Sequence, residues 1–381
     1  MKEKKFLFTP GPINTSPTVK QAMLRDVGSR EPDFLAVVRD IRHRLLALSG
    51  VSQEDGYEAI PMQGSGTFAI ESVICSTMGP EDRLLVLVNG AYGRRIHQIA
   101  QRWGIRCDLM EWAENQVPEL HRVEQQLASD PGYTHLAAVH CETTSGIVNP
   151  VELIGRVALG YGCRFMVDAM SSFAAIPVDV AEANIDFLVA SANKCLEAVP
   201  GFAFVIANRV VLQQRPCPPR TLSLDLLEQW QELEASGQFR FTPPTHAMLA
   251  CHQALVELEQ EGGIDARAAR YRQNQQTLLR EMSRLGFRAY VPPEQQSPVI
   301  TAFGYPADPK FNFEVFCERL GDRGMVIYPG KVARVESFRI GSIGQIGSQD
   351  VEALVGAVEA VLGEMGVRVP IDTARAGGNE A

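Results

Sequence analysis

Two residues in the middle of the chain have side chains suited to amino-group chemistry. Lys194 stands in the run SANKC at residues 191–195, and Asp168 ends the apolar stretch RFMVD at residues 164–168. A pyridoxal phosphate enzyme must supply a lysine that can form a Schiff base and an aspartate that can hold the pyridinium nitrogen. Alone, each has an ordinary explanation, because most lysines are solvated and an aspartate after a strand often caps a helix. Together they predict a pyridoxal phosphate site.

The apolar runs around these two residues predict where they lie. Asp168 comes at the carboxyl end of a predicted strand, which is where open α/β sheets bind their ligands. Lys194 lies between two apolar, β-rich runs, residues 186–191 and 202–208, with a Pro200-Gly201 turn between them. We therefore expect Lys194 beside the sheet and not on a solvated helix face.

A phosphate site is predicted from the segment MQGSGTFAIES. Ser65, Gly66 and Thr67 follow Gly64 and open a helix whose apolar face carries Phe68, Ile70, Val73, Ile74 and Met78. Free backbone N–H groups, two hydroxyls and the helix dipole would then point at one spot, which favours an anion. The pattern is weak alone, since such turns also begin helices that bind nothing. Beside Lys194 and Asp168 it fits the cofactor phosphate.

These residues need a sheet to position them. Apolar β-like runs alternate with helical segments between residues 61 and 208, which predicts a mainly parallel sheet covered by helices on both faces. The predicted strands are RLLVLVNG, IRCDLMEW, THLAAVHC, RFMVD, DFLVAS and FAFVIAN. A long helical stretch at about residues 264–285 then leads into a second unit, which reads as strand, helix, strand, strand, helix.

Composition narrows the function classes. The chain has 381 residues, of which 45% are hydrophobic, and a net charge of -9. This charge gives no basic face for nucleic acid, and no apolar run reaches the length of a membrane span. We expect a cytoplasmic protein with no nucleic-acid or membrane partner. The eight cysteines are scattered without C-x-x-C spacing, so we expect neither a disulfide framework nor a metal site.

With these motifs in hand, the chain resembles the class V, fold-type I aminotransferases, and most closely those acting on 2-aminoethylphosphonate and pyruvate. The resemblance spans residues 6–344 and is carried by FTPGPINTSPTV, DVGSREPDF, QGSGTFAIES, NGAYGRR, ETTSGIVNP, VDAMSSFAAIPVD, SANKCLEAVPGFAFVIA, FTPPTH and YPGKVARVESFRIGSIG. It implies an α/β fold with a mainly parallel seven-stranded sheet between helices in a large domain, plus a smaller C-terminal α+β domain. It also implies pyridoxal 5'-phosphate as the cofactor.

The resemblance assigns a role to each matching residue. Lys194 would bind the cofactor and act as the base of the proton shift, and Asp168 would pair with the ring nitrogen. Tyr92 matches the aromatic residue that stacks on the ring, although a buried tyrosine is more often part of a core. Thr143 matches a hydroxyl near the ring oxygen, a role open also to Thr144 or Ser145. Asn193 matches a polar residue beside the lysine.

Two further positions concern assembly and substrate. Thr242 matches a residue that reaches the cofactor phosphate of the neighbouring subunit, which implies a homodimer with shared active sites. Its alternative explanation is a turn before a helix with Pro243 at the first helical position. Arg339 matches a clamp for the carboxylate of the keto acid and the phosphonate of the amino donor, and Ser29 or Arg30 could assist with the phosphonate.

The expected organisation follows from these assignments. Residues 1–15 would fold over the site, 16–262 form the large domain, 263–366 form the small domain, and 367–381 form a flexible tail. Alanine or serine transfer to glyoxylate on the same framework is the close alternative. A cysteine desulfurase would need a nucleophilic cysteine such as Cys317, which falls in a helical pattern, and a non-catalytic cofactor-binding regulator is the distant alternative.

Overall fold

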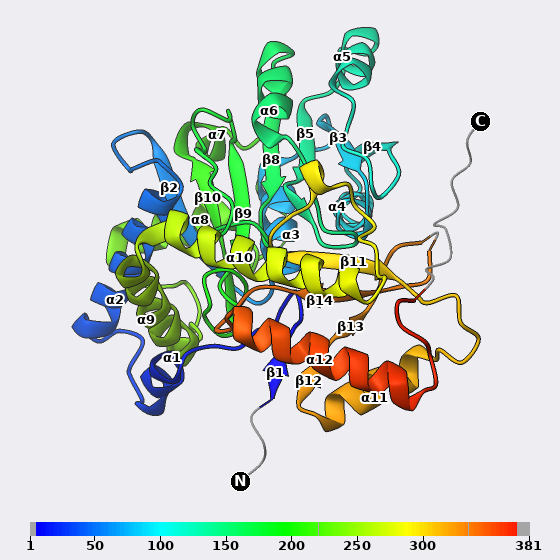
Figure 1. Ribbon diagram of the computed structural model, residues 1–381. Coiled ribbons are helices and arrows are strands. Elements are labelled where there is room, and N and C mark those ends of the chain that lie inside the picture. Colours follow the sequence, from blue (N-terminus) through cyan, green and yellow to red (C-terminus); the bar gives the residue numbers. More distant parts are fainter. Residues whose placement is uncertain (1–4, 220, 334, 372–381) are drawn as a thin grey trace.

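The computed structural model describes residues 5–219, 221–333 and 335–371, and its largest element is one twisted sheet (Figure 1). This sheet has seven strands in the order β2-β10-β9-β8-β5-β3-β4. β9, β8, β5, β3 and β4 run parallel, whereas β10 is antiparallel to both of its neighbours. The strands are β2 Tyr57–Gln63, β3 Arg83–Val88, β4 Arg106–Glu111, β5 His135–Val139, β8 Arg164–Asp168, β9 Phe187–Ser191 and β10 Phe202–Asn208. The predicted mainly parallel α/β sheet is confirmed.

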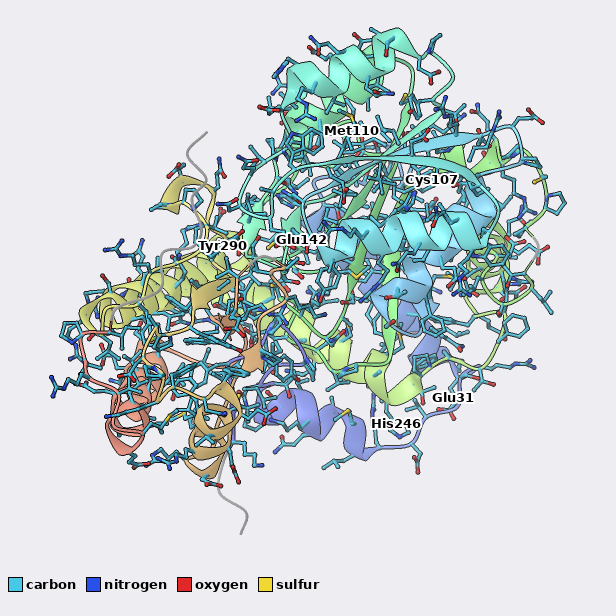
Figure 2. All side chains as sticks on the ribbon, turned by 90° about the vertical axis from the view of Figure 1, so that its right-hand side faces the viewer. Glu31, Cys107, Met110, Glu142, His246 and Tyr290 are labelled. Carbon is cyan, nitrogen blue, oxygen red and sulfur yellow. The ribbon has the colours of Figure 1, made fainter. Side chains whose placement is uncertain are left out.

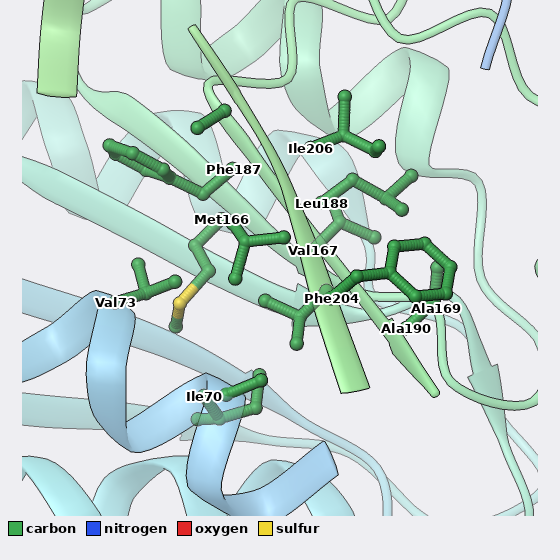
Figure 3. Packing of buried hydrophobic residues seen from close by; sticks show 14 of the residues in the cluster. Ile70, Val73, Met166, Val167, Ala169, Phe187, Leu188, Ala190, Phe204 and Ile206 are labelled. Atoms are coloured by element: carbon green, nitrogen blue, oxygen red, sulfur yellow. The ribbon is translucent and has the colours of Figure 1, made fainter. Parts of the chain in front are cut away.

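Helices cover the sheet, and their apolar faces form the large core. Figure 3 shows Met166 of β8 pointing toward Ile70 and Val73 of α3, and all three side chains are almost completely buried. Central strands of a parallel sheet are buried on both faces, so they need continuous apolar runs. The helices of this unit are α3 Gly66–Thr77, α4 Ala91–Arg102, α5 Leu120–Ser129, α6 Val151–Gly160, α7 Arg209–Gln213 and α8 Leu226–Ser236.

The edge strand β2 was not among the strands predicted from the sequence. It pairs only with β10, and its Pro61 stands opposite Phe204. Proline cannot donate a ladder hydrogen bond, so a strand that contains it is tolerated at an edge. Because a proline usually argues against a strand, the sequence around Pro61 did not predict this one.

The second unit has a core of its own. Its three-stranded antiparallel sheet has the order β11-β14-β13, and beside it α10 and α12 pack against each other (Figure 1). Its elements are α10 Gly263–Arg284, β11 Ile300–Gly304, α11 Phe313–Asp322, β12 Met325–Val326, β13 Tyr328–Pro329, β14 Ser337–Gly341 and α12 Ser348–Glu364. The predicted smaller α+β unit is thus confirmed. Val367 and Ile371 still pack into this core, and residues 372–381 of the predicted tail lie outside the described residues.

The N-terminal segment connects the two units. β1 (Phe6–Leu7) pairs with β12, and Gly341 at the end of β14 donates its N–H to Phe8 O at 2.9 Å. A third cluster of buried side chains, which includes Ile13, Cys195 and Ile343, fills the space between the two larger cores. The remaining elements are α1 Pro17–Gln21, α2 Pro32–Leu48, α9 Thr245–Glu261, the short strands β6 Cys141–Glu142 and β7 Ile147–Val148, and the short 3₁₀ helices η1 Ala22–Leu24 and η2 Pro293–Gln295.

Two features bear on the kind of protein. Across the described residues, no helix combines the length and apolar character needed to cross a membrane. In the same part of the chain, no group of three or more histidine, cysteine and acidic side chains could hold a metal ion. All eight cysteines are unpaired.

Candidate active site

Lys194 and Asp168 meet at the carboxyl edge of the parallel strands, because both follow strands of the sheet that lie side by side. Asp168 is the last residue of β8, and Lys194 lies in the turn between β9 and β10. The Lys194 ammonium donates a hydrogen bond to Ser171 Oγ at 2.8 Å and lies 5.6 Å from the centre of the Tyr92 ring. The expected position of the lysine beside the sheet is confirmed.

Asp168 is a buried carboxylate whose partners leave room for a cationic ligand. Oδ1 accepts the N–H of Met170 at 3.0 Å, and among the described side chains no lysine, arginine or histidine forms an ion pair with it. Desolvation raises the pKa of Asp168, while the Met170 N–H and the charges of Lys194 and Arg95 oppose the rise. A buried carboxylate gains most from a nearby positive charge. A protonated pyridine nitrogen fits this requirement.

The residues predicted to bind a phosphate stand at the N-terminus of α3. Ser65 is the N-cap of this helix, and its side chain makes no capping hydrogen bond, so the first N–H groups of the helix lack that partner. A Cβ at Gly66 would lie 2.0 Å from Met170 Sδ, so only glycine lets the helix end approach the loop after Asp168. Thr67 Oγ1 accepts a hydrogen bond from Arg95 at 3.2 Å. Phe68, expected on the apolar face of this helix, is instead 51% exposed.

Glu142 holds several parts of the site together and was not among the predicted residues. It is completely buried, and Figure 2 labels it near the boundary between the two units. Oε2 accepts the N–H groups of Tyr92 and Gly93 at the start of α4, at 3.1 and 3.3 Å, and Oε1 accepts the Thr144 hydroxyl at 2.6 Å. Desolvation raises the pKa of this carboxyl, although the donated hydrogen bonds oppose the rise. Its sequence signal is an acidic residue just after an apolar strand.

The three hydroxyl residues after Glu142 differ in what they contact. Thr144 Oγ1 is engaged by Glu142 and also accepts the Ala91 N–H at 2.8 Å, so it serves the local structure. Thr143 Oγ1 and Ser145 Oγ are both buried without a hydrogen-bond partner in the described part of the chain. Each therefore presents a hydroxyl that a bound cofactor could contact.

Arg339 reaches the site from the small unit. It lies on β14, is 3% exposed, and donates to Thr143 O at 2.7 Å and Pro329 O at 3.0 Å. Desolvation lowers the pKa of the guanidinium. These two carbonyls accept from Nε and Nη1, which fixes the plane of the guanidinium beside Tyr92.

The N-terminal segment covers the lysine. A Cβ at Gly11 would lie 3.2 Å from Lys194 Cγ and 3.7 Å from Asn193 Nδ2, so Pro10-Gly11-Pro12 runs directly over these two residues. The φ of +131° at Gly11 is a further reason for glycine there. Arg30, in contrast, is exposed on the loop before α2.

Within its own subunit, the Thr242 side chain does not contact the site residues described above. It is exposed, and its carbonyl accepts a hydrogen bond from Gln63, just before Gly64. The alternative of Pro243 as the first helical residue is wrong, because α9 begins at Thr245 with Pro244 as its N-cap.

Comparisons with known proteins agree with this geometry. The family described as aminotransferase class-V matches residues 18–324. A 2-aminoethylphosphonate–pyruvate transaminase of Vibrio vulnificus (strain CMCP6) is 48% identical over 364 residues, which cover 95% of this chain and 99% of the relative. One of Syntrophobacter fumaroxidans is 48% identical over 361 residues, covering 94% and 97%.

Solved structures share the fold. The alanine–glyoxylate aminotransferase from Nostoc sp. superposes with a TM-score of 0.88 at 25% identity, covering 95% of this chain and 96% of that one. The ureidoglycine–glyoxylate aminotransferase from Bacillus subtilis gives a TM-score of 0.88 at 24% identity, covering 99% and 97%. The chain therefore belongs to the class V aminotransferases, which are pyridoxal 5'-phosphate enzymes.

Proposed function

We propose that the protein transfers the amino group of 2-aminoethylphosphonate to pyruvate, giving phosphonoacetaldehyde and alanine. The observation that carries the proposal is the meeting of Lys194, Asp168 and Arg339 at one sheet edge, in a chain nearly half identical to transaminases of that name. A lysine base and a carboxylate for the ring account for the amino transfer. The arginine accounts for anionic substrates.

When bound, pyridoxal 5'-phosphate supplies an aldehyde that takes up an amino group and a protonated ring that withdraws electrons. Lys194 would hold the cofactor covalently and then, once released, move a proton at the carbon next to the substrate nitrogen. Its hydrogen bond to Ser171 keeps the free amine close to that position. Asp168 would keep the ring nitrogen protonated, and Tyr92 would cover the ring.

The remaining residues would bind and orient. Ser65, Gly66 and Thr67 would bind the cofactor phosphate at the N-terminus of α3, with Arg95 supplying positive charge beside Thr67. Thr143 would approach the ring oxygen and Asn193 the phosphate. Arg339 would bind the pyruvate carboxylate and exclude water from it.

We also propose a cytoplasmic homodimer whose sites are shared. Support comes from the exposed apolar side chains of Phe68 and of Phe241, the residue before Thr242, which line one recess, since a monomer rarely exposes such a group. A cavity of about 460 Å³ between Gly64, Phe68 and Phe241 adds a recess for a partner. Eight unpaired cysteines suit a reducing compartment.

Single-turnover spectra would test the substrate. Purified protein loaded with cofactor is mixed with 2-aminoethylphosphonate, L-alanine or L-serine, and loss of the visible cofactor band is followed. The phosphonate should react fastest, and later addition of pyruvate should restore the band and release alanine. Faster conversion by serine, with the band restored by glyoxylate, would replace this proposal with a glyoxylate-linked transamination.

A further inference from the structure

A second lysine reaches the same aromatic ring as Lys194. The Lys331 ammonium lies 5.2 Å from the centre of the Tyr92 ring, compared with 5.6 Å for Lys194. Lys331 belongs to the loop between β13 and β14, in the small unit, and its side chain is exposed. Neither composition nor the motifs of the large unit pointed to it.

The loop that carries Lys331 is held at both of its ends. Gly330 donates its N–H to Ser337 O at 2.7 Å, and a Cβ at Gly330 would lie 2.1 Å from Ser337 Oγ, so the chain turns tightly there. Two residues after the lysine, the Ala333 N–H donates to Glu114 Oε2 of the large unit at 2.8 Å. The backbone on either side thus directs Lys331 toward the pocket.

The positive charges of the pocket exceed what a single carboxylate needs. Although desolvation raises the pKa of Tyr92, the nearby charges of Lys194, Lys331 and Arg339 lower it overall, so three cations converge on this ring. Within the described part of the chain, no acidic side chain forms an ion pair with Lys331. Its charge is therefore available to a ligand.

The two substrates differ in the charge that they bring. Pyruvate carries one planar carboxylate, which the fork of Arg339 can bind alone. A phosphonate is tetrahedral, has three oxygens and carries a second negative charge when fully ionised. Binding that dianion in a partly desolvated pocket calls for a second cation, because an uncompensated charge there is costly.

We propose that Lys331 determines specificity for the amino donor by binding the phosphonate group together with Arg339. The inference rests on the proposed function, since it concerns the same site. A lysine suits this task, because a flexible point charge can follow a tetrahedral group that one planar fork cannot enclose. In the half-reaction with pyruvate or alanine, Lys331 has no second charge to bind.

The test compares Lys331→Gln, Lys331→Arg and the control Lys310→Gln in the cofactor-loaded protein. Lys310 is a matched control because it is in the small unit, where its ammonium contacts Gly366 O. Two experiments are made. One gives the maximal rate (kmax) and KM of the half-reactions with 2-aminoethylphosphonate and L-alanine, and the other gives the calorimetric affinity for ethylphosphonate, which has no amine to transfer. We expect Lys331→Gln to weaken the phosphonate half-reaction through KM, and ethylphosphonate binding, by about 10- to 100-fold. The KM of the alanine half-reaction should change much less. Lys331→Arg should recover most of the lost phosphonate binding, and Lys310→Gln should behave as wild type.

Two results would overturn the inference: no change with the phosphonates in Lys331→Gln, or an equal loss with alanine. Failure of the proposed function looks different. In that case the wild type reacts with alanine or serine but not with 2-aminoethylphosphonate. The ethylphosphonate measurement then still decides whether Lys331 binds phosphonates.

Discussion

Among the single residues of the site, Asp168 depends most on its surroundings. Its carboxylate is buried, and the only donor that contacts it at hydrogen-bond distance among the described residues is the Met170 N–H. Burial without a paired cation penalises the charged form. A cationic ring nitrogen supplies the missing charge, so the aspartate and the cofactor stabilise each other.

We predict that Asp168→Asn retains some cofactor but lowers kcat by orders of magnitude. An amide has the size of the carboxylate but no charge, so it stabilises a protonated ring nitrogen poorly. Absorbance spectra measure bound cofactor, and steady-state alanine formation measures kcat. An unchanged kcat with full cofactor occupancy would exclude the proposed role.

A second residue-scale prediction concerns His140, which precedes the Cys141–Glu142 strand and is buried. Desolvation lowers the pKa of His140 from 6.5 to about 4. The unfolded chain therefore takes up this proton at higher pH than the folded protein, so stability falls as the pH drops from 6.5 toward 4. The loss is on the order of 3 kcal/mol when complete, because one pKa unit corresponds to about 1.4 kcal/mol.

Replacing this histidine should flatten that fall. Melting temperatures of His140→Asn should decline less between pH 6.5 and pH 4 than those of the wild type, whatever the offset at neutral pH. His121, on the exposed face of α5, provides the control His121→Asn, which should keep the wild-type slope. Parallel curves for His140→Asn and wild type would contradict the assigned cause.

Residue types identified some members of the site better than others. Lys194, Asp168 and the glycines of GSGT carry their chemistry in the local sequence, and the structure brings them to one edge of the sheet. Glu142 and Lys331 act through partners far along the chain, such as Tyr92, so their local sequence does not reveal these roles. Which of the three hydroxyl residues after Glu142 faces the site also depends on the direction of each side chain, and the run TTS does not specify this direction.

Among the elements, the buried strands were predicted well from continuous apolar runs, because a strand covered on both faces carries apolar side chains at successive positions. β2 escaped prediction, since its Pro61 is tolerated only through its place at the sheet edge. The start of α9 at Thr245 was also missed, because two consecutive prolines precede it and either could begin the helix.

A buried ion-pair network joins the turn that carries Lys194 to helix α10. Glu197, three residues after the lysine, is 2% exposed and has a φ of +61°. Its Oε1 accepts Arg270 Nη2 at 2.8 Å and the Tyr271 hydroxyl at 2.5 Å, and its Oε2 accepts Gln345 Nε2 at 2.6 Å. The turn, α10 and the segment after β14 are thereby held in one arrangement.

We predict that Glu197→Gln lowers the free energy of unfolding by about 3 kcal/mol, because it leaves Arg270 and the buried Arg267 without one of their carboxylates. Glutamine keeps the size of the side chain, so the change isolates the charge. The control is Glu359→Gln, which breaks the exposed pair with Arg284 and should cost far less. Denaturant unfolding measures both, and similar losses would show that the buried network contributes little.

At the scale of the whole molecule, the pocket is assembled from both units and the N-terminal segment. Lys194 and Asp168 come from the large unit, Arg339 and Lys331 from the small one, and Gly11 lies over the lysine. The chain as a whole has a net charge of -9, yet this pocket concentrates positive charge. Such a contrast draws anionic substrates to the site.

The proposed dimer yields a prediction by complementation. If Thr242 completes the partner's phosphate site, Lys194→Ala mixed with Thr242→Ala after joint unfolding and refolding forms heterodimers with one intact and one doubly defective site. Random pairing should then recover about a quarter of wild-type activity, provided that Thr242→Ala alone is strongly impaired. No recovery in verified heterodimers would count against shared sites.

The most direct test of the central claim is to identify the lysine that holds the cofactor. The loaded protein is reduced with borohydride, digested and analysed by mass spectrometry. We expect the pyridoxyl phosphate mass on the peptide containing Lys194, and its absence from Lys194→Ala. Modification of Lys331 instead, which lies near the same ring, or a Lys194→Ala protein that still turns over 2-aminoethylphosphonate and pyruvate, would contradict it.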